Sequence, residues 1–317
     1  MEHISVLKEG VEKYLELNSG DKVIDATLGL GGHAEMILKR IGEKGCLIAF
    51  EQDERNLKEA KTRLKKYEKQ TIYLNDNFCY LKTRITEQGI TEVDAILFDL
   101  GLSSPHVDEP ERGFSFMEDG PLDMRFDQSS PLTAADVLNT YDESDLADIF
   151  FRYGEERLGR KIARKICERR KTEKFVSTLQ LAGFLEKIMP RQDLKKGKKR
   201  HPATKIFQAL RIEVNDEMNV LEEALQQSVE VLKVGGRIVV ISYHSVEDRI
   251  VKQFFKNLIK PPASEEEKIY RTHGEPFVEP LTKKPVIPTP EEVEQNPRSR
   301  SAKLRAYKLK KPIIPIK

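Results

Sequence analysis

Three glycines and a histidine follow directly after a short apolar run near the N-terminus. Residues 22–28 read Lys-Val-Ile-Asp-Ala-Thr-Leu, and behind them stand Gly29, Gly31, Gly32 and His33. The residues that follow, as far as Ile41, have helical periodicity. A strand, a glycine-rich turn and a helix together allow the backbone to approach a nucleotide-like ligand closely. This segment therefore predicts a site for an adenosine-containing cofactor.

Four later loops carry polar or aromatic residues where a predicted strand ends. The second predicted strand ends in Glu51, a carboxylate that can accept hydrogen bonds from ribose hydroxyls. The other three loops are 75–78, 99–106 and 242–249. Because ligands of open parallel sheets bind beyond the carboxyl ends of the strands, we expect all these residues around one site.

Each feature also has an ordinary structural interpretation. The glycine spacing alone is a weak fingerprint of dinucleotide enzymes. Phe78 fits a core position as well as an adenine platform, and Asp99 ends an apolar strand, where a carboxylate is costly unless it faces a polar site. His106 and His244 have no partners at metal-ligand spacing, so no metal site is expected. The five loops together favour a ligand site.

The elements that must position these residues alternate along the chain. Strands are predicted at 22–27, 46–51, 71–74, 94–99 and 237–242, and helices at 5–17, 33–41, 54–67, 80–88, 217–232 and 246–259. This alternation predicts an α/β fold with a doubly wound, mostly parallel sheet covered by helices on both faces. A turn is expected at Gly235-Gly236, and residues 302–309 are expected to form an edge strand.

The alternation stops after the fourth predicted strand. Residues 102–131 predict a long ordered loop, followed by helices at 136–140, 144–153, 157–170 and 178–189, a basic loop at 195–200 and another helix from His201. We therefore expect a Rossmann-like domain made of residues 1–108 and 213–317. A loop and helical substrate-binding domain, residues 109–212, is expected to interrupt it.

Composition and charge narrow the class of protein. The 317 residues contain no apolar run of the roughly 20 residues that span a membrane and no signal peptide at the N-terminus. Three scattered cysteines are typical of the reducing cytoplasm. The net charge of +2 hides three basic clusters, at 152–171, 191–205 and 298–311. The clusters favour a polyanion-binding face over merely solvated helices.

Several long motifs run through nearly the whole chain. They are His3–Leu7, Asp25–His33, Asp99–Pro105, Arg112–Phe116, Asp119–Arg125, Tyr153–Arg157, His201–Arg211, Ser242–Lys252 and Asn296–Arg305. With these motifs the chain resembles the bacterial 16S ribosomal RNA cytosine-N4 methyltransferase family, which uses S-adenosylmethionine. The resemblance implies a Rossmann-like methyltransferase fold and 16S ribosomal RNA of the small subunit as the partner.

The resemblance also implies which residues contact the cofactor. They are Gly31, Gly32, His33, Glu51, Phe78, Asp99 and His106. The family usually has Asp where this chain has Glu51, and the longer acid can still reach a ribose. The family usually has Gln where this chain has His106, which can also form hydrogen bonds but can in addition carry a charge.

The implied reaction is methyl transfer to the exocyclic N4 amine of a cytosine in the decoding region. Because that amine is a poor nucleophile, an enzyme must hold it in line with the methyl group and accept its hydrogen bonds. We assign that task to the Asp99 carboxylate and to the backbone of Leu100, Gly101 and Leu102. The cytosine must leave its stack to react. Candidate substrate contacts are Phe114, Phe116, Asp123, Arg125, Tyr243, His244, Lys198 and Lys199.

Some alternatives stay open at this point. Asp123 and Arg125 fit a structural ion pair as well as a catalytic role. A dinucleotide dehydrogenase, a non-catalytic ribosome-assembly factor and an amino-methyltransferase for another acceptor are the competing functions. The sequence is compatible with a monomer or a homodimer.

Overall fold

The chain folds into two compact units. The computed structural model describes residues 5–189, 192–193, 199–260 and 276–313. The first unit, the sheet unit, contains residues 1–101 and 218–317, and the second, the helical unit, contains residues 102–217. The first is therefore discontinuous in sequence, and the second is slightly longer at both ends than the predicted insertion.

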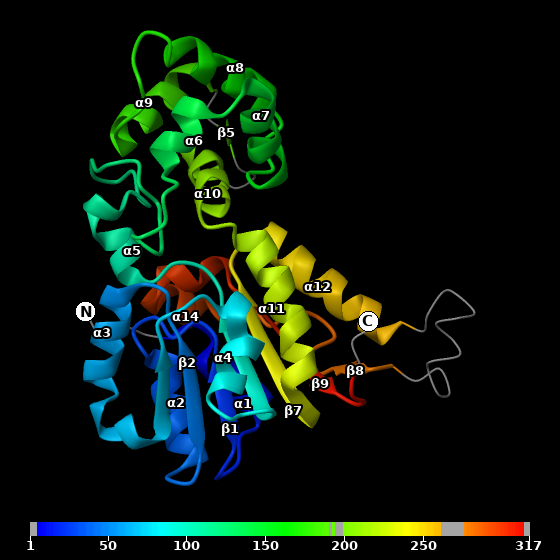
Figure 1. The fold of residues 1–317 in the computed structure, drawn as a ribbon. Helices are drawn as coiled ribbons and strands as arrows, with labels where there is room; N and C mark the ends of the chain where they lie inside the picture. The colour runs from blue at the N-terminus through cyan, green and yellow to red at the C-terminus, as the bar shows by residue number, and fades with distance from the viewer. Residues whose placement is uncertain (1–4, 190–191, 194–198, 261–275, 314–317) are drawn as a thin grey trace. The chain divides into compact units, whose positions relative to one another are not determined.

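A seven-stranded sheet forms the centre of the sheet unit (Figure 1). Its strand order is β3-β2-β1-β4-β7-β9-β8; the pairs from β3 to β7 are parallel and the last two are antiparallel. The strands are β1 (Lys22–Asp25), β2 (Cys46–Phe50), β3 (Thr71–Leu74), β4 (Val93–Asp99), β7 (Leu232–Ser242), β8 (Val278–Pro280) and β9 (Lys303–Leu309). The order reverses between β1 and β4, where open parallel sheets bind their ligands.

Helices cover both faces of this sheet, as its apolar runs predict. One face packs against α1 (Lys8–Leu15), α2 (Gly32–Ile41) and α3 (Glu54–Arg63). The other face packs against α4 (Leu81–Glu87), α11 (Glu217–Val231) and α12 (Ser245–Ile259). Burial on both sides explains why the strands are continuous apolar runs rather than alternating ones. A further helix, α14 (Pro290–Gln295), precedes β9.

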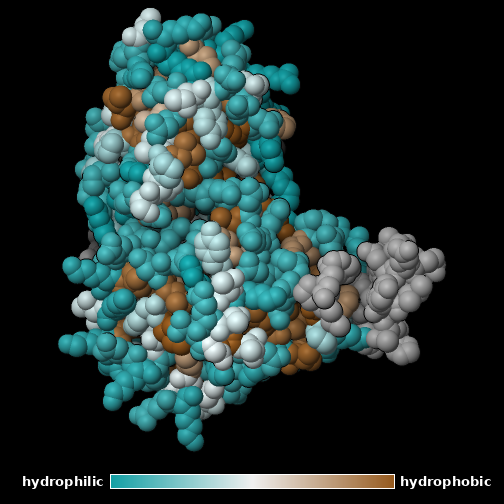
Figure 2. Space-filling view, viewed as in Figure 1, coloured by the Kyte–Doolittle hydropathy of each residue, from teal (hydrophilic) through white to brown (hydrophobic). Residues whose placement is uncertain are grey.

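The helical unit has its own hydrophobic core. Its helices are α5 (Ser104–Asp108), α6 (Ala134–Thr140), α7 (Glu143–Arg152), α8 (Gly159–Arg169), α9 (Thr178–Ile188) and α10 (Ala203–Val214). A two-stranded antiparallel pair, β5 (Gln192–Asp193) with β6 (Lys199–Arg200), lies between α9 and α10 in sequence. In the space-filling view hydrophilic residues predominate and hydrophobic residues form separate patches (Figure 2).

The structure corrects four details of the sequence analysis. The strand predicted at the edge, β9, lies inside the sheet because the short β8 pairs with it. The predicted turn at Gly235-Gly236 lies within β7, at a shift in its register with β4. The predicted loop 102–131 begins with α5, and the end of the predicted basic loop, Lys199–Arg200, forms β6. The rest of that basic loop lies outside the described residues.

No helix among the described residues is long and apolar enough to cross a membrane.

Candidate active site

The ends of β1, β2, β4 and β7 are bound to one another at the carboxyl edge of the sheet. The amide of Leu28 donates to the carbonyl of Phe50, and that of Leu100 donates to the carbonyl of Ile241, at 2.9 and 3.0 Å. The amide of Asp99 donates to Thr27 Oγ1 at 2.6 Å. These bonds hold the loops after neighbouring strands in fixed positions, as the predicted site requires.

The glycine turn after β1 takes a backbone shape that other residues adopt poorly. Gly29 and Gly31 have φ values of 51° and 78°, in the left-handed region. A Cβ on Gly31 would lie 3.1 Å from Leu64 Cδ1. Gly31 is also the N-cap of α2, and Gly32 is the first residue of that helix. The turn therefore leaves the backbone beside a helix N-terminus uncovered by side chains, where a polar ligand can approach.

Glu51 is buried directly after β2, and two backbone amides bind its carboxylate. Oε2 accepts from Gly29 at 2.9 Å, and Oε1 accepts from Asp53 at 2.8 Å. Burial raises the pKa of Glu51 to about 7, although these two amides oppose the rise. A carboxylate has about four lone-pair directions, so ribose hydroxyls can still donate to it.

Buried Asp25 and His33 lie with partly exposed Asp99 at the ends of β1 and β4. His33 Nε2 lies 3.4 Å from Asp99 Oδ2. Asp25 Oδ1 accepts from the amide of Thr27 at 3.1 Å, while its Oδ2 has no hydrogen-bond partner among the described residues. Burial raises the pKa of Asp25 to about 6, and His33 opposes the rise. A buried oxygen without a partner is costly unless a ligand or water satisfies it.

Tyr243 lies beside Asp99, which the sequence analysis did not foresee. Its hydroxyl donates to Asp99 Oδ1 at 2.8 Å. Burial and the Asp99 carboxylate raise the pKa of Tyr243 well above its usual range, so the hydroxyl remains a donor. The ring also lies against Gly101, where a Cβ would be 3.0 Å from Tyr243 Cδ2. Tyr243 thus orients the proposed acceptor, and its role in stacking on a base stays a prediction.

Phe78 lies in the loop after β3 and is partly buried. Its ring packs edge-on against Phe98, with centroids 5.6 Å apart. Asn75 Nδ2 donates to the carbonyl of Glu51 at 2.8 Å, which fixes this loop against the end of β2. Phe78 therefore belongs to the core and lies on a loop bound to Glu51.

His244 caps α12. Its Nδ1 accepts from the amide of Glu247 at 3.3 Å, and its Nε2 lies 3.0 Å from Glu247 Oε1. The other Glu247 oxygen accepts from the amide of Tyr243 at 2.8 Å. This capping box gives His244 a structural role in starting the helix. Its assignment to substrate binding stays a prediction.

His106, in the helical unit, is buried in an aromatic cluster. Its ring centroid lies 5.0 Å from those of both Phe114 and Phe126. Its Nδ1 accepts from the amide of Ser103 at 3.3 Å, within the capping box of α5. The stacked pair of Phe114 and Phe126 is itself buried, so Phe114 does not serve as an exposed platform for a base.

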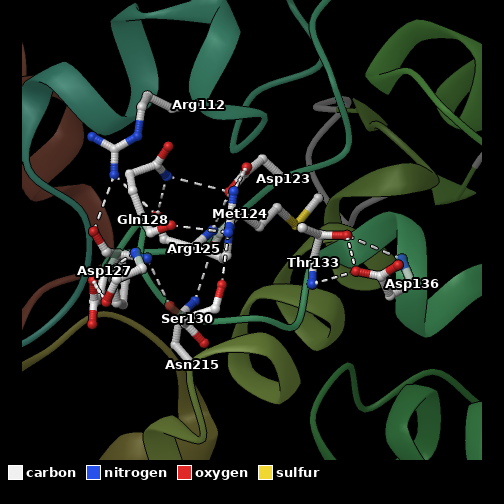
Figure 3. A network of polar contacts seen from close by, with 12 residues as sticks. Arg112, Asp123, Met124, Arg125, Asp127, Gln128, Ser130, Thr133, Asp136 and Asn215 are labelled. Carbon is white, nitrogen blue, oxygen red and sulfur yellow. Dashed lines mark hydrogen bonds and ion pairs between the residues drawn. The ribbon is translucent and has the colours of Figure 1, made fainter.

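Asp123 and Arg125 form an ion pair inside a dense loop network (Figure 3). Arg125 Nη2 and Asp123 Oδ2 are 2.6 Å apart, and Arg125 also donates to the carbonyls of Gln128 and Ser130. Hydrogen bonding and charge from Arg125 outweigh the effect of burial and lower the pKa of Asp123. Buried Arg112 donates to the carbonyls of Arg125 and Phe126. The predicted pairing of Asp123 with Arg125 is therefore present, and their assignment to substrate binding stays a prediction.

The remaining candidate substrate residues lie in different surroundings. Phe116 is partly buried between His201 and Phe207, with centroids 4.6 and 4.8 Å away. Lys199 lies in β6, and Lys198 lies outside the described residues. The basic cluster 298–311 is partly used inside the sheet unit. There Arg305 and Lys303 pair with Asp248, and Lys310 pairs with Glu279.

Comparison with known proteins shows the family of this chain. The model of the MraW methylase family matches residues 1–310. The chain belongs to this family. Ribosomal RNA small subunit methyltransferase H of Streptococcus mutans serotype c is 44% identical over 305 residues, which cover 96% of each chain. The protein of the same name from Streptococcus dysgalactiae subsp. equisimilis is 43% identical over 308 residues, 96% of this chain and 97% of that one.

A solved structure, an rRNA methylase from Streptococcus thermophilus, is also similar to this methylase. It has 11% sequence identity and a TM-score of 0.43, with 98% of this chain and 100% of that chain covered.

The methylase is S-adenosylmethionine-dependent, and its strand ends fit that cofactor. S-adenosylmethionine carries a cationic sulfonium and a ribose. Oδ2 of Asp25 and both ring nitrogens of His33 are buried without hydrogen-bond partners among the described residues. The two amides that bind Glu51 occupy only part of the hydrogen-bonding capacity of its carboxylate. Acids with raised pKa values favour a cationic ligand, because its charge offsets their desolvation. Asp25 is not among the predicted cofactor contacts, although the sequence has an acid near the end of the first predicted strand.

Proposed function

We propose that this methylase transfers the methyl group of S-adenosylmethionine to the N4 amine of a cytosine in the decoding region of 16S ribosomal RNA. The choice of substrate is supported by the similarity, over 96% of the chain, to proteins named ribosomal RNA small subunit methyltransferase H. Such a substrate places the enzyme in the cytoplasm. The geometry of the strand ends supports the chemistry.

In the proposed site the glycine turn and Glu51 hold the adenosine part of the cofactor, and Asp25 and His33 line its charged part. Phe78, on the loop bound to Glu51, completes this side. When bound, S-adenosylmethionine supplies the activated methyl group. His106 belongs to the helical unit, and its predicted cofactor contact remains part of the proposal.

Asp99 is the proposed acceptor for the amine protons. The amine lone pair is delocalised into the cytosine ring, and the nitrogen must become tetrahedral as it attacks. A carboxylate that accepts a hydrogen bond from the amine favours that change. The Tyr243 hydroxyl donates to Oδ1 of Asp99 and so orients the carboxylate before the substrate arrives. The backbone of Leu100 and Gly101 offers further acceptors.

Methyl transfer to purified small ribosomal subunits tests the proposal. Subunits come from cells that lack this gene, the methyl donor is tritiated S-adenosylmethionine, and nuclease digestion locates the label. We expect label on N4 of one cytosine in the decoding region. Tight cofactor binding without any transfer to the subunits, or label on another base, would contradict the proposal.

A further inference from the structure

The motif Tyr153–Arg157 links α7 to α8, and the function proposed above does not use it. Lys205 Nζ donates to the carbonyl of Glu155, and Gln208 Nε2 donates to that of Tyr153, both at 2.8 Å. Glu156 is buried, and its Oε1 accepts from the amide of Leu158 at 3.0 Å. Helix α10 therefore holds this link firmly and sets the start of α8.

Two glycines bring the end of α7 close to the start of α8. A Cβ on Gly154 would lie 2.7 Å from the carbonyl oxygen of Phe150, so this approach requires glycine. A Cβ on Gly159 would lie 3.4 Å from the amide nitrogen of Phe151. Phe151 is nevertheless 64% exposed. The two helices pack side by side (Figure 1), and Phe151, near the end of α7, has its backbone next to Gly159 at the start of α8.

Cations gather on the exposed side of α8 next to this junction. Arg160, Lys161 and Arg164 are exposed, and their spacing places them along one side of α8; exposed Arg157 lies in the turn just before this helix. The opposite side, with Ile162, Ala163 and Ile166, is buried. For Arg157, Arg160 and Lys161 the structure records no ion pair with any described residue, and Arg164 is 4.0 Å from Glu168.

The acid of α8, Glu168, lies near the far end of that helix, whereas exposed Asp148 of α7 lies 3.5 Å from Arg152 and exposed Glu155 lies in the link. Glu168 is 2.6 Å from Lys165, and Glu173 is 2.6 Å from Arg169. Burial raises the pKa of Cys167 near the end of α8, and Glu143 and Asp142 at the start of α7 add to the rise. The first turn of α8 contains no acid. Positive charge still predominates at the start of α8, where four exposed cations stand against exposed Glu155.

We infer that Phe151, Arg157, Arg160, Lys161 and Arg164, here called the hairpin-tip surface, bind a single-stranded segment of the RNA substrate. In this arrangement the four cations bind backbone phosphates and the Phe151 ring stacks on one unpaired base. Exposed cations, three of them without an ion pair to any described residue, together with an exposed aromatic ring are the combination that single-stranded nucleic acids require. The inference rests on the proposed ribosomal RNA substrate and names the surface that holds it.

Binding of a fluorescein-labelled single-stranded RNA to the full-length enzyme, measured by anisotropy over a series of salt concentrations, tests the inference. For Arg160→Gln with Lys161→Gln, we expect at least about tenfold weaker binding and a salt slope lower by about 1.4, because two phosphate contacts are lost. For Phe151→Ala, we expect about tenfold weaker binding with an unchanged salt slope, and Phe151→Tyr should restore the affinity.

The matched control is Lys65→Gln with Lys69→Gln in the sheet unit. It removes the same charge from two exposed lysines, and we expect unchanged RNA affinity. Cofactor affinity and thermal unfolding of every variant should match the wild type. Equal loss in the control, or wild-type affinity in Phe151→Ala, would overturn the inference. So would loss of binding to whole subunits with unchanged binding to RNA, which would indicate a ribosomal protein as the partner.

Methyl transfer by the wild-type enzyme distinguishes a failure of the inferred RNA-binding surface from a failure of the proposed function. If the wild type methylates the subunits but the hairpin-tip variants bind RNA normally, only the inference fails. If the wild type does not methylate ribosomal RNA, the proposed function fails.

Discussion

Three carboxylates at neighbouring strand ends of the sheet are held in different ways. Glu51 accepts from two backbone amides, Asp99 accepts from a tyrosine hydroxyl, and Asp25 keeps one buried oxygen without a partner among the described residues. Concentrating acids in a buried place costs stability unless a cationic ligand is bound. The buried acids therefore lower the free energy of unfolding of the cofactor-free enzyme, and binding of the cofactor offsets this loss.

The destabilisation by these acids should depend on pH, because only their ionised forms are unfavourable in a buried place. The pKa of Glu51 is raised from 4.5 to about 7, and that of Asp25 from 3.8 to about 6. In these ranges the folded state binds more protons than the unfolded state, so the free energy of unfolding falls as the pH rises. We expect the cofactor-free enzyme to lose on the order of 2 kcal/mol between pH values of about 5 and about 8.

Urea denaturation across that pH range measures the effect. Glu51→Gln should flatten the profile, and saturating S-adenosylmethionine should do the same in the wild type. A wild-type stability that stays constant or rises with pH would contradict this account.

Asp99 and Asp94 lie at opposite ends of β4 and allow a matched comparison. Asp94 accepts from the amide of Lys22 and from Lys233 Nζ, both at 2.8 Å, at the end of the strand remote from the site. We expect Asp99→Ala to lower kcat by a factor of about 100 or more, since a group that acts in the transition state is lost. Asp94→Ala should retain kcat and lose about 1 kcal/mol of stability. Single-turnover methyl transfer measures both rates. Similar rates for the two variants would show that Asp99 does not take part in the reaction.

At the scale of elements, the loop that contains Arg112 depends on a close approach between backbone segments that only glycine allows. Gly113 has a φ of +73°, and a Cβ there would lie 2.2 Å from the carbonyl oxygen of Pro121. We expect Gly113→Ala to destabilise the helical unit by more than about 3 kcal/mol, because strain and overlap add. The same change at Gly183, inside α9 with no atom within 4 Å of the new Cβ, should instead stabilise it by up to about 1 kcal/mol. Thermal unfolding of both variants measures the contrast, and equal shifts would contradict it.

The prediction of secondary structure was correct where the local sequence has one strong pattern. The apolar runs of β1, β2 and β4, and the glycine turn that starts α2, were correct because burial on both faces leaves a clear pattern. The position of β9 was wrong because its neighbour β8 has three residues and no apolar run. The link from Tyr243 to Asp99 was also missed, since 144 residues separate them and only the pairing of β4 with β7 brings them together.

At the scale of the whole molecule, the two units have separate cores. Gly31, Gly32, His33, Glu51, Phe78 and Asp99 all belong to the sheet unit, whereas His106 belongs to the helical unit. We expect a variant in which a flexible linker replaces residues 102–217 to fold and to bind S-adenosylmethionine, while failing to methylate subunits. Calorimetric titration with the cofactor measures this. An unfolded variant, or complete loss of cofactor binding in a folded one, would show that the sheet unit depends on the helical unit.

The discontinuous sheet unit has a consequence for synthesis of the chain. When residue 217 leaves the ribosome, the helical unit is complete, but β4 still lacks its neighbour β7 and presents an open edge. An unpaired edge of a nascent sheet invites aggregation. The helical unit can therefore fold first. The sheet unit can complete its sheet only after the last third of the chain, which contains β7, β8 and β9, has been synthesised. A ribosome that stalls after residue 217 would hold a folded helical unit on an unfinished sheet.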